Sequence, residues 1–501
     1  MKKLPIFYNA LMLTVVNLLL RAVATSFQVM LSGRIGAAGV GLLQLVLSMA
    51  SMTMTAGMAG VRTASMYLTA EELGKGRAQN VTWVLSGCLL YSLCFSAVVG
   101  GIVYVCAPQI AQLWIGDVGV TGAIRLFAAF LPVSCFTGVM VGYFTAANRI
   151  ATLAAVEVAE QVCAMAVTLV ALLCWAGEDI HRACISVVLG SSVGGLLTLA
   201  CLAYLRIREG AQRGVRIPVA RRLAETALPL AVADDLKVGI NTIENLMVPK
   251  RLSLFTPDAL AQFGMVGGMV FPVIMFPAAI LYGLADLLIP ELARCNAAQS
   301  RQRIRYLARR SLRTAAVYGV LCGGVIYMLA DVLARGLYHN DQVAIWLRPY
   351  ALLVPMLYCD AIIDAMNKGL GQQKICVRLN IFTALLDVAG LYVLLPRWGM
   401  QGYWISFFVT HALNAALSLR LLLKTSKIRV RWRMPLAMIF AMAMAILFAD
   451  MLPGWGGKSL GYVLLVACLL VLTGAVRKED GFWLRNLVKL QKFPEKMKNN
   501  V

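Results

Sequence analysis

Apolar runs of about 20 residues recur along the whole chain, separated by short polar or basic segments. A helix needs about 20 apolar residues to cross the hydrocarbon core of a bilayer, because each residue adds 1.5 Å to a path of about 30 Å. The pattern therefore predicts an all-α polytopic membrane protein with about fourteen transmembrane helices. The predicted spans are 6–32, 38–68, 81–106, 123–146, 151–175, 184–205, 223–249, 259–290, 314–332, 343–366, 376–395, 400–423, 435–452 and 458–476.

One predicted span, Leu223–Pro249, is apolar overall but carries several charges. At 100° per residue its polar residues share an arc of about 100°, which makes a stripe along one face. Each ionised side chain at mid-membrane depth costs about 2.5–3.5 kcal/mol, so we expect this face to line a water-filled cavity of a transporter. The stripe consists of Asp234, Lys237, Asn241, Glu244 and Asn245, while Asp235 points away from it.

The first span carries a second polar stripe, which includes Asn17, Arg21 and Gln28. A guanidinium group in a cavity suits a phosphate or pyrophosphate, which it binds with two parallel hydrogen bonds. The alternative is that Arg21 pairs with an acidic neighbour for purely structural reasons. Arg62 is a candidate second anion contact or an interfacial side chain. Lys237 either assists from the facing helix or neutralises Asp234.

The eleventh span has Thr383 and Asp387 on one face. A carboxylate with hydroxyl and amide neighbours is a candidate site for a hard cation or a proton, and Asp234 or Asp235 is expected to complete it. A structural partner for a basic side chain is the open alternative. The chain has no GxxxxGK[ST] motif for ATP. We expect no enzyme activity and no cofactor, with Na⁺ or H⁺ coupling left open.

The distribution of charged residues predicts the orientation of the chain in the membrane. The net charge is +22, and the basic residues concentrate in alternate loops. This positive-inside pattern predicts an even number of spans, with both termini in the cytoplasm. Basic inner loops attract anionic lipid, so the excess charge requires no nucleic acid. We expect a monomer.

Two segments six spans apart resemble each other. Arg125 stands seven residues before Pro132, as Arg348 stands before Pro355, and both spans end in a Gly-containing or amide-rich basic turn. We therefore expect parallel repeats with the substrate site between them. The predicted parts are an N-terminal six-helix lobe (1–210), a basic linker (211–222), a C-terminal six-helix lobe (223–424), an accessory helix pair (435–476) and a basic tail (477–501).

Several segments together resemble the stage V sporulation protein B family. They are SGRIGAAGVGLLQLV, AGMAG, VGYFTAANRI, FGMVGGMVFPVIMFPAAILYGLADLLIPELAR and KGLGQQK. This family is related to polysaccharide transporters and lipid II flippases of the multidrug/oligosaccharidyl-lipid/polysaccharide flippase superfamily. The resemblance covers residues 5–424.

The resemblance implies two six-helix lobes around a central cavity and rocking alternating access. It also implies flipping of an undecaprenyl-pyrophosphate-linked oligosaccharide, with roles in sporulation or cell-wall synthesis. Arg21 matches the first cavity arginine of lipid II flippases, whereas Phe27 replaces the second. Thr383 and Asp387 match the eleventh-span part of a sodium site, with Thr in place of Asn. A cation-coupled multidrug antiporter and a non-transporting scaffold or envelope enzyme are the alternatives.

Overall fold

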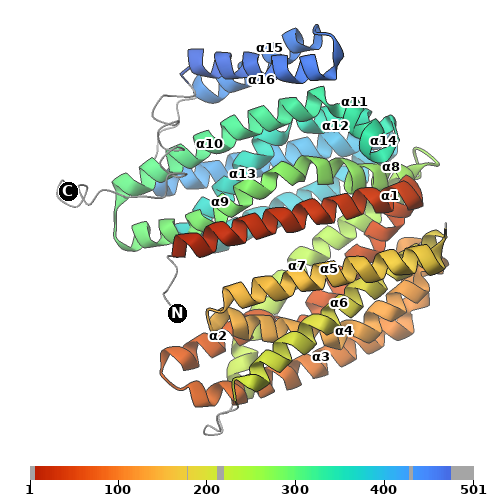
Figure 1. Ribbon diagram of the computed structural model, residues 1–501, viewed down its shortest axis with the longest axis vertical. Helices are drawn as coiled ribbons and strands as arrows, with labels where there is room; N and C mark the ends of the chain where they lie inside the picture. The colour runs from red at the N-terminus through yellow and green to blue at the C-terminus, as the bar shows by residue number, and fades with distance from the viewer. Residues whose placement is uncertain (1–5, 178, 211–218, 428–432, 475–501) are drawn as a thin grey trace. The chain divides into compact units, whose positions relative to one another are not determined.

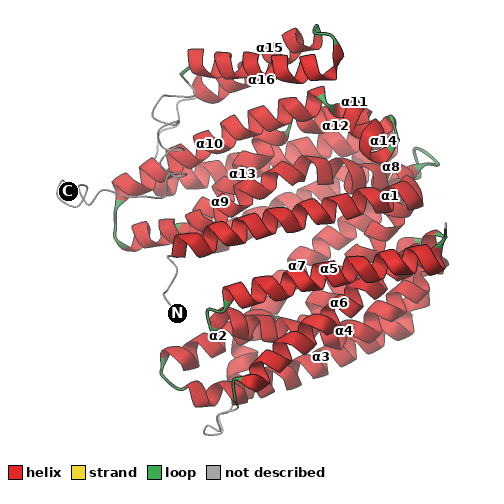
Figure 2. Ribbon diagram, in the orientation of Figure 1, coloured by secondary structure: helices red, strands yellow, loops and turns green. Residues whose placement is uncertain are grey.

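The computed structural model describes residues 6–177, 179–210, 219–427 and 433–474, and within these ranges the chain is helical with no strand (Figures 1 and 2). Most of the predicted linker and the whole predicted tail lie outside these ranges. The all-α prediction is confirmed. The α-helices are α1 (Ile6–Met58), α2 (Val61–Gly74), α3 (Val81–Gln109), α4 (Thr121–Ala146), α5 (Ile150–Ala171), α6 (Ile180–Arg208), α7 (Val219–Leu252), α8 (Ala259–Met265), α9 (Phe271–Ala297), α10 (Arg301–Met328), α11 (Ala330–Leu333), α12 (Gln342–Ala351), α13 (Val354–Gly369), α14 (Gln373–Ser426), α15 (Arg433–Asp450) and α16 (Gly454–Leu472).

Among the described residues, nine helical segments are long and apolar enough to cross a membrane, or ten if the bent pair α12–α13 is one span. Helices α1 and α14 have 53 and 54 residues, about 80 Å each, which is far more than one crossing needs. Each has a non-helical glycine inside, Gly36 in α1 and Gly399 in α14, and therefore supplies two spans. The shorter apolar α15 and the charged α7 bring the helical segments to the predicted fourteen.

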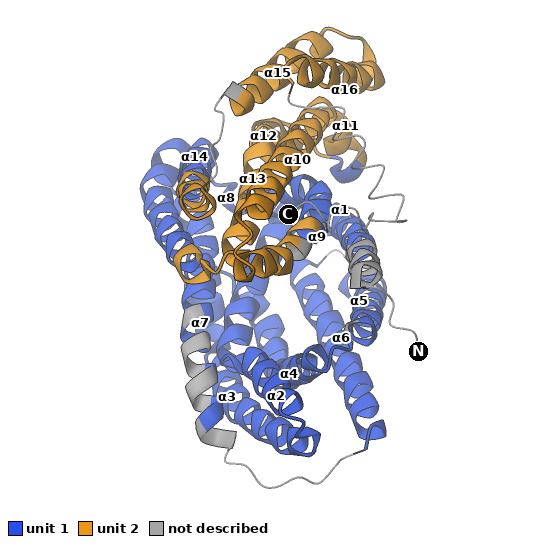
Figure 3. Cartoon of the chain, turned by 90° about the vertical axis from the view of Figure 1, so that its left-hand side faces the viewer, with its two compact units in different colours: residues 1–283, 337–339, 377–414 blue, residues 284–336, 340–376, 415–501 orange. Residues whose placement is uncertain are grey.

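The chain divides into two compact units (Figure 3). Unit 1 comprises residues 1–283, 337–339 and 377–414, and unit 2 comprises residues 284–336, 340–376 and 415–501. The six-helix lobes expected from the sequence stay a prediction.

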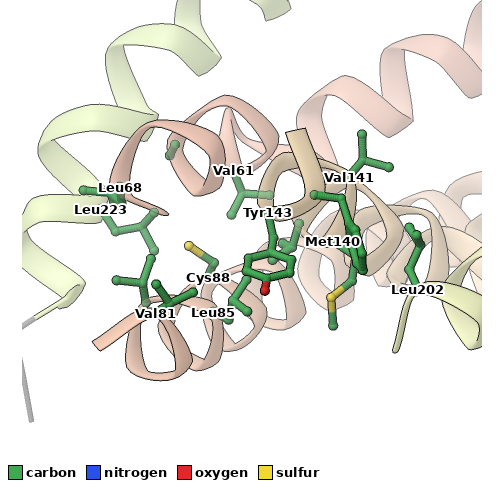
Figure 4. Packing of buried hydrophobic residues seen from close by; sticks show 14 of the residues in the cluster. Val61, Leu68, Val81, Leu85, Cys88, Met140, Val141, Tyr143, Leu202 and Leu223 are labelled. Carbon is green, nitrogen blue, oxygen red and sulfur yellow. The ribbon is translucent and has the colours of Figure 1, made fainter. Parts of the chain in front are cut away.

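Unit 1 contains a buried apolar cluster with residues from α2, α3, α4, α5, α6 and α7 (Figure 4). Helices α3 and α4, α4 and α6, and α5 and α6 lie side by side (Figure 1). Beside the cluster, Arg222 of α7 donates to Glu72 of α2 over 3.0 Å and to Glu71 over 2.6 Å. Glu72 is only 1% exposed, so these ion pairs fix the start of α7 against α2.

Helices α1 and α8 approach each other so closely that neither tolerates a side chain at the contact. A Cβ atom on Gly264 would overlap the carbonyl oxygen of Ala37 and the backbone of Gly41, and one on Gly41 would overlap the carbonyl oxygen of Leu260. Small residues are typical of membrane helix contacts, because close backbone approach supplies the van der Waals attraction that the hydrophobic effect cannot supply in lipid. Gly41 and Gly264 lie in two of the segments that carry the family resemblance, and they form a packing surface of unit 1.

The similarity between the segment that contains Arg125 and Pro132 and the segment that contains Arg348 and Pro355 extends to their packing. A Cβ atom on Gly100 would lie 2.9 Å from the carbonyl oxygen of Ala128, and one on Gly323 would lie 2.7 Å from that of Ala351. Each residue of the second pair follows its counterpart by 223 positions, as Pro355 follows Pro132. Spans three and four therefore pack on each other as spans nine and ten do.

The connecting turns repeat as well. A π-helical turn precedes Gly116 and another precedes His339, and both of these residues have a positive φ, 85° and 51°. Gly177 and Gly399 end the fifth and eleventh spans with nearly the same backbone, φ 57° with ψ −124° and φ 56° with ψ −137°. This region of φ and ψ is essentially restricted to glycine.

We expect Gly264→Ala to destabilise the protein by about 1–3 kcal/mol, because an added methyl group in a filled contact forces the backbones apart. The measurement is the thermal unfolding midpoint in detergent. Gly239→Ala in α7 is the matched control, since nothing lies within 4 Å of its added Cβ and alanine favours a helix. Equal midpoints for the two variants would contradict the packing described here.

Candidate functional site

Helix α7 presents its predicted polar stripe away from its packing face. Asp234, Lys237 and Asn241 are exposed, and Glu244 is half-buried. The packing face faces α1, where the Asn245 amide donates to the Ser48 hydroxyl over 3.0 Å. Asn245 was expected in the stripe, but it belongs to this packing face. The other four stripe residues do not take part in the contact with Ser48.

An acidic site in unit 1 combines residues of α7 and α14. Asp387 of α14 is 6% exposed, and the Ser406 hydroxyl donates to its Oδ1 over 2.6 Å. The Glu244 carboxylate lies close enough to Asp387 for the two charges to interact. Tyr403 lies within electrostatic range of both carboxylates. Span seven and both spans of α14 thus contribute to one group of polar oxygens.

Two further polar residues surround this site. Thr383, one turn before Asp387, is also 6% exposed, and its hydroxyl donates to Asn414 Oδ1 over 3.4 Å. His411 stacks on Phe407 with ring centroids 3.9 Å apart. Its Nδ1 lies 2.9 Å from the Phe407 carbonyl oxygen, and the ring is within electrostatic range of Asp387.

The partner of Asp387 differs from the one expected. The sequence pattern predicts Asp234 or Asp235 as this partner, yet Glu244 is the acidic residue of α7 whose charge interacts with that of Asp387. Ten residues separate Asp234 from Glu244, which is about 15 Å along a helix. Asp235 is half-buried. Its carboxylate interacts electrostatically with the Asp234 carboxylate and with Tyr91 of α3. The structure therefore brings Thr383 and Asp387 together with Glu244, whereas the other two acids lie elsewhere on α7.

The residues of the twelfth span escaped the sequence analysis, although their spacing contains a signal. Tyr403, Ser406, Thr410 and Asn414 follow one another at i, i+3, i+7 and i+11, the spacing of one helix face. The chemistry of the site fits a hard cation that accepts carboxylate and hydroxyl oxygens. Within the described part of the chain, no three His, Cys, Asp or Glu side chains converge on a metal position.

The first-span stripe lies elsewhere in unit 1. The Arg21 guanidinium is half-buried, 6.0 Å from the ring centroid of Tyr282 in α9, and it forms no ion pair with a described residue. The Gln28 amide donates over 3.0 Å to the carbonyl oxygen of Gly268, in the π-helical turn Val266–Val270. Asn17 lies in α1, where the structure does not describe its side chain.

The remaining two cations are exposed. Arg62 lies in the first turn of α2, within electrostatic range of the Glu157 carboxylate of α5. Lys237 forms no ion pair with Asp234, one turn before it on α7, nor with another described carboxylate. Neutralisation of Asp234 by a direct contact is therefore not the role of this lysine in the structure.

Known proteins match the chain in sequence and in fold. Residues 229–393 match the MatE family model. Stage V sporulation protein B of Bacillus subtilis (strain 168) is 21% identical over 416 residues, which cover 80% of both chains. Sporulation protein YkvU of the same organism is 21% identical over 287 residues, 53% of this chain and 61% of that protein.

Solved structures share the fold. An inward-facing multidrug resistance MATE family transporter of the MOP superfamily aligns with a TM-score of 0.66 at 14% identity, over 83% of this chain and 98% of that one. A MOP superfamily transporter from Pyrococcus furiosus, described as having a binding pocket of reversed polarity, aligns with a TM-score of 0.60 at 16% identity, over 83% and 95%.

These matches confirm the resemblance that the sequence motifs predicted, and Glu244, Thr383 and Asp387 of the acidic site fall inside the MatE match. The chain is a polytopic membrane protein that matches the MatE family model over residues 229–393, is similar to stage V sporulation protein B, and has the fold of solved MOP superfamily transporters.

Proposed function

We propose that the protein is a flippase that moves a lipid-linked cell-envelope oligosaccharide of the undecaprenyl-pyrophosphate type across the bacterial inner membrane by alternating access. Both termini are cytoplasmic in this proposal, and a monomer is the working unit. Similarity to stage V sporulation protein B along 80% of the chain supports this branch of the superfamily.

The environment of Arg21 carries the proposal. A guanidinium inside an apolar span is costly unless it is paired, and a carboxylate would normally serve as its partner. Arg21 has the Tyr282 ring nearby and no ion pair with a described residue. A pyrophosphate group would bring a counter-charge to Arg21, and a guanidinium binds it through two parallel hydrogen bonds.

In this proposal, the acidic site couples transport to a gradient of Na⁺ or H⁺. Glu244 and Asp387 lie near each other, and neither forms an ion pair with a described Lys or Arg side chain. Two neighbouring carboxylates repel each other unless a cation or proton lies between them. We therefore assign Na⁺ or H⁺ binding to this pair, with Ser406 and Thr383 as neutral oxygen groups nearby.

A multidrug antiporter is the second candidate. The favouring observation is the acidic site, which also suits exchange of a cation for a cationic drug. A structural neighbour with a TM-score of 0.66 is itself a multidrug resistance transporter. In this alternative Arg21 has only a structural role.

Arg21→Ala should lower export of the lipid-linked sugar by tenfold to about a hundredfold, because a hydrogen bond to a charged group is worth about 1.5–3 kcal/mol. Arg21→Lys should retain part of the activity, since it keeps the charge without the two-pronged geometry. The measurement is complementation and sugar export in cells that depend on this protein.

The matched control is Arg34→Ala, which removes an exposed arginine of the same helix. It should export normally. Full activity of the Arg21→Ala protein, with equal amounts in the membrane, would refute the anion-binding role.

Asp387→Asn and Glu244→Gln should each abolish the response of transport to an imposed cation gradient. Each change removes one of the two charges that attract the cation. The measurement is flipping of the lipid-linked sugar in proteoliposomes under a sodium gradient and, separately, a pH gradient. Asp234→Asn is the control and should respond as the unaltered protein does; loss of the response in this variant alone would refute the assignment.

Efflux of a cationic dye should be the same with the unaltered protein and with Asp387→Asn, because the proposed substrate is an anion. Dye accumulation in cells that lack other exporters measures this. Dye efflux that the protein supports and that Asp387→Asn removes would favour the antiporter instead.

A further inference from the structure

Unit 2 has a pocket that the proposed function does not use. Its volume is about 270 Å³, and it lies where the ends of α10, α11 and α12 meet the turn between α15 and α16. Helix α10 begins with the basic run Arg301–Arg313 and ends at this pocket. Because basic segments mark the cytoplasmic side, the pocket belongs to the outer end of unit 2. Its lining is Tyr327, Met328, Asp331, Val332, Arg348, Asp450, Gly454, Trp455 and Lys458.

The two C-terminal helices form part of this pocket because they are firmly packed on α10. The Tyr462 hydroxyl of α16 donates to the carbonyl oxygen of Val320 over 2.7 Å. The Tyr462 ring fills the space where a side chain on Gly324 would lie. Met438 and Met442 of α15 belong to the same buried cluster. The sequence left the role of this pair open, and the packing makes it a wall of the pocket.

The pocket contains two charges of each sign. Arg348 donates to Asp331 over 2.6 Å, and Lys458 donates to Asp450 over 2.5 Å. The four side chains are 33–64% exposed. Exposed ion pairs are worth at most about 1 kcal/mol, so a ligand that carries both charges can exchange partners with them at little cost.

The apolar surroundings match an interface with lipid. Trp455 is 64% exposed and Met451, in the adjoining turn, is 81% exposed. Trp and Tyr are enriched at the depth of lipid headgroups, where one side of the ring meets acyl chains and the other meets water. The rim of the pocket therefore has the kind of side chains that are enriched at headgroup depth.

We propose that this pocket binds the headgroup of a zwitterionic aminophospholipid, phosphoethanolamine, in the outer leaflet. Arg348 and Lys458 bind the phosphate. Asp331 and Asp450 bind the ammonium group, and the Trp455 ring face adds a cation–π contact. The acyl chains lie along the exposed apolar surface of the turn.

The repeat supplies an internal comparison. Arg125 and Tyr104 correspond to Arg348 and Tyr327, each 223 positions earlier, and the Arg125 guanidinium lies 5.6 Å from the Tyr104 ring centroid. The counterpart of Asp331 is Pro108, which has no charge. The first repeat therefore has the arginine and the tyrosine without this carboxylate.

The test is lipid retention and thermal stability of the full-length protein. Purified protein is exposed to phosphatidylethanolamine, phosphatidylcholine or phosphatidylglycerol in detergent, and bound lipid is counted by native mass spectrometry. Phosphatidylethanolamine should be retained preferentially and should raise the unfolding midpoint. The phosphatidylcholine ammonium carries three methyl groups and donates no hydrogen bond to a carboxylate, and phosphatidylglycerol has no ammonium.

Arg348→Gln and Asp450→Asn should each weaken retention of phosphatidylethanolamine by about tenfold, which corresponds to about 1.4 kcal/mol. Arg125→Gln is the matched control and should retain it fully. Asp450 lies at an exposed turn, so its variant remains informative if Arg348→Gln fails to fold.

Two results would overturn the proposal. One is equal retention of the three lipids; the other is lowered stability of both pocket variants with unchanged lipid preference, which would make the ion pairs purely structural. Soluble phosphoethanolamine, added in a separate arm, should compete with the lipid. If the soluble compound stabilises the protein and phosphatidylethanolamine does not, the ligand is a free metabolite and the lipid assignment is wrong.

Discussion

The cost of placing charge inside a bilayer governs where polar groups occur in this protein. Most of its ion pairs lie at helix ends, as between Arg222 and the Glu71–Glu72 pair, or between Arg149 and Glu209. Asp387 and Glu244 depart from this rule, because they lie within spans and pair with no described basic side chain. Buried polar groups that lack such partners are expensive, which singles out this part of unit 1 for function.

The sequence predicted the spans and the faces of α7 and α14 because both follow from local periodicity. Apolar length identifies a span, and the spacing of polar residues identifies its wet face. The pairing of Glu244 with Asp387 depends on how far α7 is shifted along its axis relative to α14, and no local pattern contains that shift. The polar face of a helix can therefore be predicted from its sequence, but the position along the helix at which that face meets another helix cannot. For this reason Asp234 was expected near Asp387, whereas the structure has Glu244 there.

The C-terminal helix pair shows the same limit. Its spans were recognisable from length and apolarity, but their faces are nearly uniform, so nothing in their pattern indicated a partner. The partner is specified from the other side, by a glycine in α10 that leaves room for the Tyr462 ring. A space left by a missing side chain is hard to recognise in a sequence, since it has meaning only when the residue that fills it is known.

The constant spacing between the two repeats has a consequence for how the chain can vary. From Gly100 to Pro132, and again from Gly323 to Pro355, two helices and their π-turn connection have the same length. One inserted residue in that connection would rotate the next helix by about 100° and shift it by 1.5 Å. Gly100 or Gly323 would then face a different carbonyl oxygen, and Pro132 or Pro355 would no longer lie on the same face of its helix. The length of the connection is therefore fixed. A helix pair can be exchanged for another only together with its connection, and exchange of one helix alone would disturb the packing.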